Sequence, residues 1–214
     1  MKKNSILIVI LSLMIVSVSI FHSKTADAHF KFTADDEELV LGGVYVGMDI
    51  DDVLGAYGAP TEMEPYYNVI WGGTAGEVQR KYQWKPLLMN VWTGDKTIGN
   101  DVTIVHSVHV GAVGAYLNES LRKNPKIQEI RTPAGIYVGM PAEKALAVYG
   151  ITLEQAQQEN IQNLKRLNLR PGQPGAFSSV SIWLYNTDNT QYMCIDVDLK
   201  VQMVTKIELK ANDK

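Results

Sequence analysis

Two segments of the chain repeat the same order of apolar and polar positions. Residues 43–58 read GVYVGMDIDDVLGAYG and residues 135–150 read GIYVGMPAEKALAVYG, with eight of the sixteen positions identical. In both, apolar side chains recur at positions i, i+3, i+4 and i+7, which is the spacing of one face of a helix. Asp49 and Pro141 suit the starts of these helices, and Gly58 and Gly150 suit their ends. The pattern predicts an internal duplication, each copy holding a short amphipathic helix.

Alternating apolar and polar residues predict three strands after each helix. They are expected at 78–84, 87–92 and 102–110, and again at 178–185, 191–198 and 201–209. A capping-box pattern at Thr152–Gln155 predicts a second helix in the later copy, ending before Pro171. Residues 59–73 are expected to form a loop, and residues 111–134 a connection. The predicted fold class is therefore α+β, with two tandem repeats of a module made of helices and a three-stranded antiparallel meander, at 29–118 and 119–214.

The first 28 residues have the three parts of a secretory signal peptide. A basic start is followed by an uncharged apolar run, 6–20, and by the small residues Ala26 and Ala28 before the expected cleavage site at His29. The run is short for a membrane span, which needs about 20 residues, so cleavage is favoured over an uncleaved anchor. We expect an exported protein with no integral membrane span after cleavage. Its final place would be the periplasm, the cell surface or the extracellular medium.

Charge and cysteine content narrow the possible partners. The chain has 20 basic and 23 acidic residues; without residues 1–28 these become 20 − 3 = 17 and 23 − 1 = 22, a net charge of −5. An acidic chain without a basic stripe argues against nucleic acid or anionic lipid as partner. The single cysteine, Cys194, cannot close an intrachain disulfide and is expected to be packed in a strand.

A Gly-x-x-x-Gly-Met start, an amphipathic helix ending in glycine and a meander form a module that resembles outer-membrane assembly lipoproteins of the SmpA/OmlA (BamE) type. Two such modules in tandem look like the β-lactamase inhibitor protein fold. The resemblance implies a protein that binds other proteins through a sheet face. The chain departs from these families, because it has no N-terminal lipid-anchor cysteine and no disulfide. The matching residues are Gly43, Gly47, Met48, Leu54 and Gly58, then Gly135, Gly139, Met140, Leu146 and Gly150.

No motif in the chain predicts catalysis, and we expect no catalytic residue, no cofactor and no enzyme activity. Ser107 lies beside His106, but neighbours in a strand point to opposite faces. An N-terminal His29 could bind copper through its amine and imidazole, with His106 or His109 as a second ligand. We expect ordinary histidines and no metal, and keep a metal- or small-ligand-binding envelope protein as the alternative.

Aromatic residues in the predicted strands give the main functional lead. If Val180, Ile182 and Leu184 face the helices, Trp183 and Tyr185 face away from them. Exposed tryptophan and tyrosine commonly anchor protein interfaces. The hypothesis is a non-catalytic module that binds another protein, as an inhibitor or an envelope accessory factor. The alternative for these rings is burial between two packed sheets. The proposed contact residues are Trp84, Trp92, Trp183, Tyr185 and Tyr192.

Overall fold

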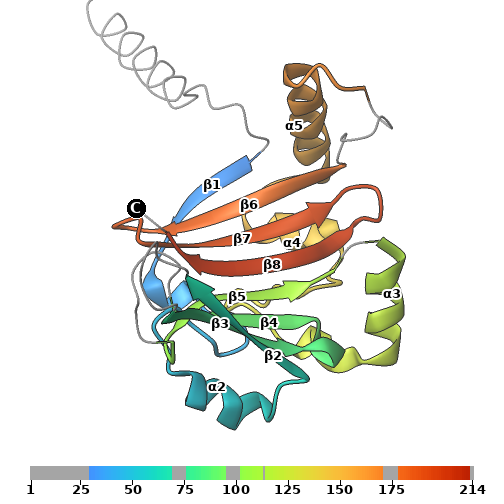
Figure 1. Cartoon of the computed structure of the whole chain (residues 1–214). Coiled ribbons are helices and arrows are strands. Elements are labelled where there is room, and N and C mark those ends of the chain that lie inside the picture. The colour runs from blue at the N-terminus through green and yellow to red at the C-terminus, as the bar shows by residue number, and fades with distance from the viewer. Residues whose placement is uncertain (1–28, 69–75, 95–101, 113, 171–177, 213–214) are drawn as a thin grey trace, which may run out of the picture.

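A computed structural model describes residues 29–68, 76–94, 102–112, 114–170 and 178–212. The predicted signal peptide and its cleavage site lie outside the described residues. The strands form a single eight-stranded sheet in the order β1-β6-β7-β8-β5-β4-β3-β2 (Figure 1). All neighbouring strands are antiparallel except β1 and β6, which run parallel.

The six strands expected from alternation are present, with bounds shifted by up to three residues. The strands are β1 (His29–Ala34), β2 (Glu62–Asn68), β3 (Gly76–Trp84), β4 (Met89–Thr93), β5 (Val105–Gly111), β6 (Ser179–Asn186), β7 (Gln191–Asp198) and β8 (Met203–Ala211). The α-helices are α2 (Ile50–Tyr57), α3 (Gly114–Lys123), α4 (Ala142–Val148) and α5 (Leu153–Arg166). Single 3₁₀ turns lie at η1 (Asp36–Glu38), η2 (Lys85–Leu87) and η3 (Pro125–Glu129).

The two similar segments make the same backbone contacts. The Gly47 N–H donates to the Val105 carbonyl at 2.8 Å, and the Gly139 N–H donates to the Val204 carbonyl at 2.8 Å. Both glycines have φ of +92°, a conformation that side chains other than glycine rarely adopt. The shared sequence therefore encodes the same local structure twice, a glycine turn that connects the start of a helix to the first residues of β5 or β8.

The predicted fold class, two tandem three-stranded modules, is wrong. The last strands of the two expected meanders, β5 and β8, pair with each other, with Val108 opposite Leu209 and Val110 opposite Ile207. This pairing joins all strands in one mixed sheet. Its physical cause is that each meander ends in an apolar strand whose unpaired backbone groups would otherwise be buried. Alternation along a strand shows which face is apolar and does not show its neighbours.

Three further elements differ from the sequence prediction. Residues 59–73 contain the edge strand β2, where a loop was expected, and β3 begins at Gly76, two residues earlier than expected. The connection 111–134 contains α3 and η3. The described part of the chain also begins with β1, a strand that was not expected and that adds to the far edge of the sheet beside β6.

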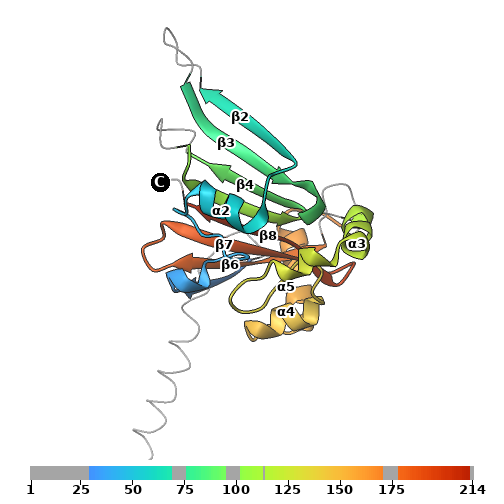
Figure 2. The same ribbon diagram turned by 90° about the horizontal axis from the view of Figure 1, so that it is seen from below.

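Helices cover one face of the sheet. Ile50 and Val53 of α2, and Ala145 and Leu146 of α4, are buried in the core. The core also takes alternate residues of the strands, among them Val91, Ile195 and Ile207, which are fully buried. Figure 2 shows β2 and β3 extending from one end of the sheet, while α4 and α5 gather at the other. Among the described residues, no helix combines the length and apolar character needed to cross a membrane.

Candidate functional site

The face of the sheet opposite the core carries two complete rows of side chains. Direct cross-strand partners point to the same face, so the strand register places each row across all eight strands. Neither row contains an aliphatic side chain. The first row is Lys31, Trp183, Cys194, Glu208, His109, Asn90, Gln83 and Glu62, and the second is Thr33, Tyr185, Tyr192, Lys210, Ser107, Trp92, Lys81 and Glu64.

An aromatic cluster lies at the β1–β6–β7 end of this open face. The Trp183 and Tyr185 rings are nearly parallel, at 11° with centroids 5.9 Å apart, and the Tyr192 centroid lies 5.0 Å from that of Trp183. His29 approaches the Trp183 ring at 5.4 Å. All three aromatic residues are half-buried. The structure thus brings together three of the five residues that the sequence singled out.

These rings form part of a shallow open pocket of about 550 Å³, which we call the aromatic groove. Its lining combines aromatic rings with one cation and two amides: Lys31, Trp183, Tyr185, Asn189, Tyr192 and Asn212. Rings supply apolar contact area, and amide and ammonium groups supply directional hydrogen bonds. The buried Nε1 of Trp183 has no hydrogen-bond partner among the described residues.

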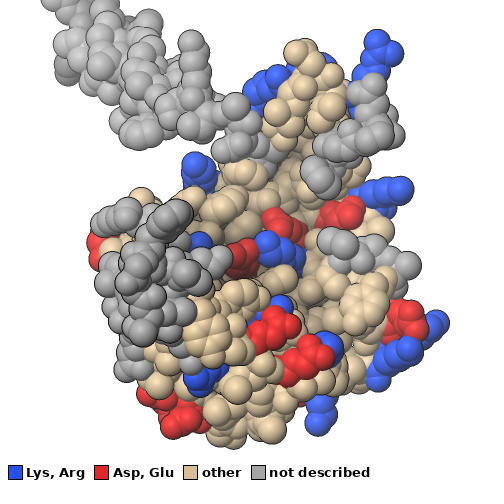
Figure 3. Space-filling model, viewed as in Figure 1, with Lys and Arg blue, Asp and Glu red and all other residues tan. Residues whose placement is uncertain are grey.

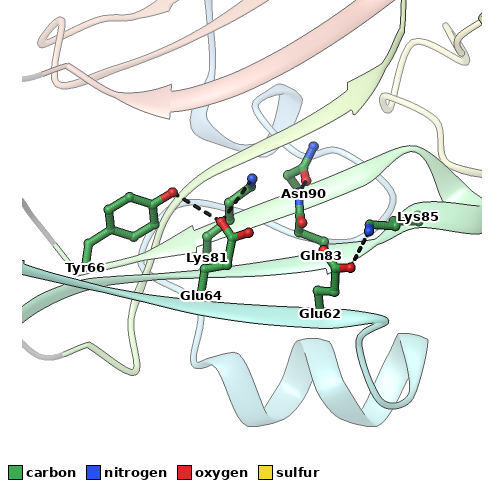
Figure 4. A network of polar contacts seen from close by, with 7 residues as sticks. All are labelled: Glu62, Glu64, Tyr66, Lys81, Gln83, Lys85 and Asn90. Atoms are coloured by element: carbon green, nitrogen blue, oxygen red, sulfur yellow. Dashed lines mark hydrogen bonds and ion pairs between the residues drawn. The ribbon is translucent and has the colours of Figure 1, made fainter.

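Trp92 lies at the opposite end of the open face, against Lys81 and Tyr66, which belong to the polar network drawn in Figure 4. The Lys81 Nζ lies 5.3 Å from the centroid of the Trp92 ring and 3.5 Å from a carboxylate oxygen of Glu64. The Tyr66 ring packs at 5.1 Å from Trp92, and its hydroxyl donates to Glu64 at 3.3 Å. A cation covers this tryptophan, and a carboxylate of the same chain neutralises the cation.

Trp84 does not belong to the open face, which corrects its place among the predicted contacts. Its side chain is 4% exposed, and its Nε1 donates to the Gly58 carbonyl at 3.1 Å. Gly58 ends α2, and Tyr57 of that helix packs its ring at 6.2 Å from Trp84. The reason lies in β3, where Lys81 and Gln83 occupy the open-face positions and turn Tyr82 and Trp84 toward the helices.

A strip of charged residues separates the two aromatic regions, and acidic and basic side chains alternate there across the middle of the face (Figure 3). Lys206 Nζ lies 2.6 Å from Glu208 and 3.8 Å from Asp196, and the Ser181 hydroxyl donates to Asp196 at 2.6 Å. Burial, reinforced by the charge of Lys206, lowers the pKa of the nearby His109.

Cys194 is a packed thiol, as its place in a strand suggested. Burial, followed by the charge of Asp196, raises the pKa of its thiol far above the ordinary value. A nucleophilic cysteine requires the thiolate, so this environment suppresses the reactive form. Within the described ranges, no group of three His, Cys, Asp or Glu side chains could hold a metal ion.

The histidine pair considered for copper is too widely separated. His29 is on β1 and His109 on β5, with β6, β7 and β8 between them. Neighbouring strands are about 4.8 Å apart, so the two strands lie about 19 Å from one another. His106 is on β5 as well. Metal-bound nitrogens lie about 2 Å from the ion, so neither histidine can join His29 at one metal.

Sequence reasoning missed Lys31, Asn189 and Asn212 of the groove. A signal for Lys31 was present, because HFKFTA at 29–34 alternates Phe30 and Phe32 with Lys31 and Thr33. Asn189 and Asn212 reach the groove from the β6–β7 turn and from the end of β8. Their placement depends on tertiary structure that local patterns do not contain.

No protein-family model matches the chain, and no curated protein matches it. Solved structures with a related arrangement include a cysteine-rich secretory protein from Staphylococcus aureus, with 10% identity and a TM-score of 0.44, covering 86% of this chain and 50% of that one. An extracellular protein containing an SCP domain from Bacillus anthracis has 12% identity and a TM-score of 0.34, covering 78% of this chain and 44% of that one. The chain thus spans half or less of the length of these proteins.

The expected likeness to BamE-type proteins and to the β-lactamase inhibitor fold is wrong. No model of either family matches, and the strands form one mixed sheet in place of two separate three-stranded modules. The glycines of the supposed family motif serve a local turn, and such a turn can occur in unrelated folds.

Proposed function

We propose that this chain is an exported, non-catalytic protein that binds another protein through the aromatic groove. The observation that carries the proposal is the setting of Trp183, Tyr185 and Tyr192. They are half-buried on a sheet face that no described helix covers, and they line a pocket with Lys31. Tryptophan and tyrosine dominate the energy of protein interfaces when a partner removes them from water. Export is supported by the signal-peptide pattern of residues 1–28.

The open face suits a macromolecular partner better than a chemical reaction. The ionisable groups in the middle of the face are engaged with one another, as in the Ser181–Asp196–Lys206–Glu208 strip, and the thiol of Cys194 is held protonated. A broad face with aromatic anchors and a surrounding of satisfied polar groups has the composition of an interface.

The test is affinity capture from the envelope and culture proteins of the source organism. The bait is the exported protein, and retained proteins are quantified by mass spectrometry. The variant Trp183→Ser/Tyr185→Ser should lose a partner that the wild type retains. The matched variant Tyr66→Ser/Trp92→Ser, which changes the same residue types at the other end of the face, should retain it. Equal retention by wild type and both variants would exclude the groove as the binding surface.

A small ligand is a second candidate, favoured by the size and lining of the groove. Its volume of about 550 Å³ falls within the range of about 300–1,000 Å³ of ligand pockets, and Asn189 and Asn212 offer amide groups. A fluorescence titration of Trp183 with fractionated small molecules from the culture medium would distinguish a small ligand from a protein partner. A saturable response without any captured protein would favour the small ligand.

A further inference from the structure

The two edges of the sheet differ in how they are protected. Exposed edge strands can pair with other chains, and proteins commonly block this with proline, charge or a bulge. The β2 edge has all three: Pro65 lacks an N–H, the register shifts between Tyr66 and Tyr67, and Glu62 and Glu64 add two carboxylates. A strand arriving at β2 would meet a broken ladder beside carboxylates that are already paired with Lys85 and Lys81.

The β1 edge carries the charge of Lys31 but lacks the proline and the bulge. Its six residues contain no proline and no acid, and they pair with β6 in an unbroken register from His29–Ser181 to Ala34–Asn186. In a ladder of this kind, alternate residues of β1 direct their N–H and C=O groups away from β6. Within the described part of the chain, no strand pairs with that side.

The two faces of β1 have different chemistry. Lys31, on the open face beside the aromatic groove, is exposed. Among the described residues, no carboxylate forms an ion pair with it. On the helix face, Phe30 and Phe32 pack against the core but remain partly exposed, with Phe32 5.2 Å from the Tyr149 ring. An incoming strand would therefore meet one cation on one face and two phenylalanine rings on the other.

We propose that β1 is a docking edge for an extended segment of the partner protein. The segment adds a ninth strand, places an acidic side chain beside Lys31, and packs apolar side chains against Phe30 and Phe32. Backbone hydrogen bonds supply affinity in such strand addition, and alternate side chains supply specificity. The proposal rests on the proposed function, since the same partner would cover the aromatic groove from its β1 side.

The charge of Lys31 also argues for a foreign strand over a second copy of this chain. The sequence of β1, HFKFTA, contains a lysine and no acid. Pairing β1 with β1 of another copy would bring two lysines to one short ladder whose six paired residues contain no acid. A cation in the middle of an otherwise unprotected strand thus disfavours self-association and selects acidic segments.

The test uses the exported protein and two defined probes. These are an acetylated, amidated octapeptide of alternating Glu and Val, and a Lys–Val octapeptide of the same length. Dissociation constants are measured by fluorescence anisotropy. The Glu–Val peptide should bind at least about tenfold more tightly than the Lys–Val peptide. The variant Lys31→Glu should remove or reverse that preference, and the control Lys144→Glu, with the same charge change on an exposed residue of α4, should leave it intact.

Hydrogen exchange of the backbone amides then locates the bound peptide. We expect the amides of residues 29–34 to exchange more slowly when the peptide is bound. We also expect the peptide to lose at least tenfold in affinity when its alternate backbone nitrogens are methylated. Failure of both peptides to bind, equal affinities in wild type and Lys31→Glu, or slower exchange elsewhere would overturn the proposal. So would a sedimentation result showing that β1 pairs two copies of the chain.

The failure of this proposal can be distinguished from failure of the groove hypothesis. A captured partner that is lost in Trp183→Ser/Tyr185→Ser, but leaves exchange in 29–34 unchanged, supports groove binding and excludes strand addition. If a peptide adds to β1 but no partner protein is captured, the docking edge is supported and the hypothesis of protein binding through the groove is not.

Discussion

The two ends of the open face carry similar rings in opposite electrostatic settings. At the β2–β4 end, Trp92 lies beneath Lys81, and Lys81 is paired with Glu64. At the β1–β7 end, Trp183 stands in a groove next to Lys31, which has no ion pair among the described residues. One end satisfies its cation within the chain, and the other leaves both rings and cation available to a partner.

The difference shows why aromatic content alone is a poor guide to a binding surface. A ring covered by a neutralised cation already has its favourable contacts, so a partner would have to displace them. A half-buried ring beside an unneutralised cation gains contact area and a counter-charge when a partner arrives. The predictions below test this contrast from the largest expected effect to the smallest.

The largest effect should come from Trp84, which the sequence grouped with Trp183. Trp84→Ala removes a buried ring and its hydrogen bond to the end of α2. We expect the free energy of unfolding to fall by about 3–5 kcal/mol. Trp183→Ala should cost clearly less, because its ring is half-exposed. Urea denaturation of both variants measures this, and equal losses would show that Trp183 belongs to the core.

The second effect concerns partner binding. Trp183→Ser should weaken the captured complex about thirtyfold or more, which corresponds to about 2 kcal/mol and is typical of a tryptophan hot spot. Trp92→Ser should weaken it less than about threefold, because Lys81 covers that ring. Surface plasmon resonance with the immobilised partner gives both values. A larger loss for Trp92 would move the interface to the other end of the face.

Alternation predicted the strands well because it reflects a local physical requirement, one apolar face per strand. It also placed Trp183 correctly, since Val180, Ile182 and Leu184 define the buried face of β6. The same rule places Trp84 in the core once Lys81 and Gln83 are recognised as its outward neighbours. The error at Trp84 came from grouping aromatic residues without comparing the residues between them.

The rest of the architecture depends on contacts between distant residues. Pairing of β5 with β8, and of β1 with β6, joins residues about 100 and 150 positions apart. Hydrophobic periodicity carries no information on such pairings. The groove depends on them too, because Lys31 reaches Trp183 only through the β1–β6 pair. The outward orientation of Trp183 and Tyr185 was therefore predictable from the sequence, and the pocket that they line was not.

A smaller effect should follow from removing the charge of Glu64. Glu64→Gln leaves Lys81 above Trp92 without its carboxylate, and partly exposed ion pairs contribute about 0.2–1 kcal/mol. We expect a loss of stability in that range and no gain of partner binding at this end. Glu62→Gln, which removes the exposed pair with Lys85, is the matched control. Thermal unfolding at low and high salt should show the difference shrinking as salt screens the pair.

The smallest effect is a pH dependence from His109, on the strip between the two ends. Burial lowers its pKa below the ordinary value of 6.5, so the folded chain resists a proton that the unfolded chain accepts. Wild type should therefore lose stability as pH falls through 6.5, and the loss should level off below the folded pKa. His109→Gln removes this dependence while keeping a polar side chain. Subtracting the two stability curves between pH 5 and 8 cancels the contributions of the carboxylates. A difference of the opposite sign would mean that Glu208 and Asp196, which favour the charged imidazole, outweigh burial and Lys206. The strip would then be a negative surface between the two aromatic regions.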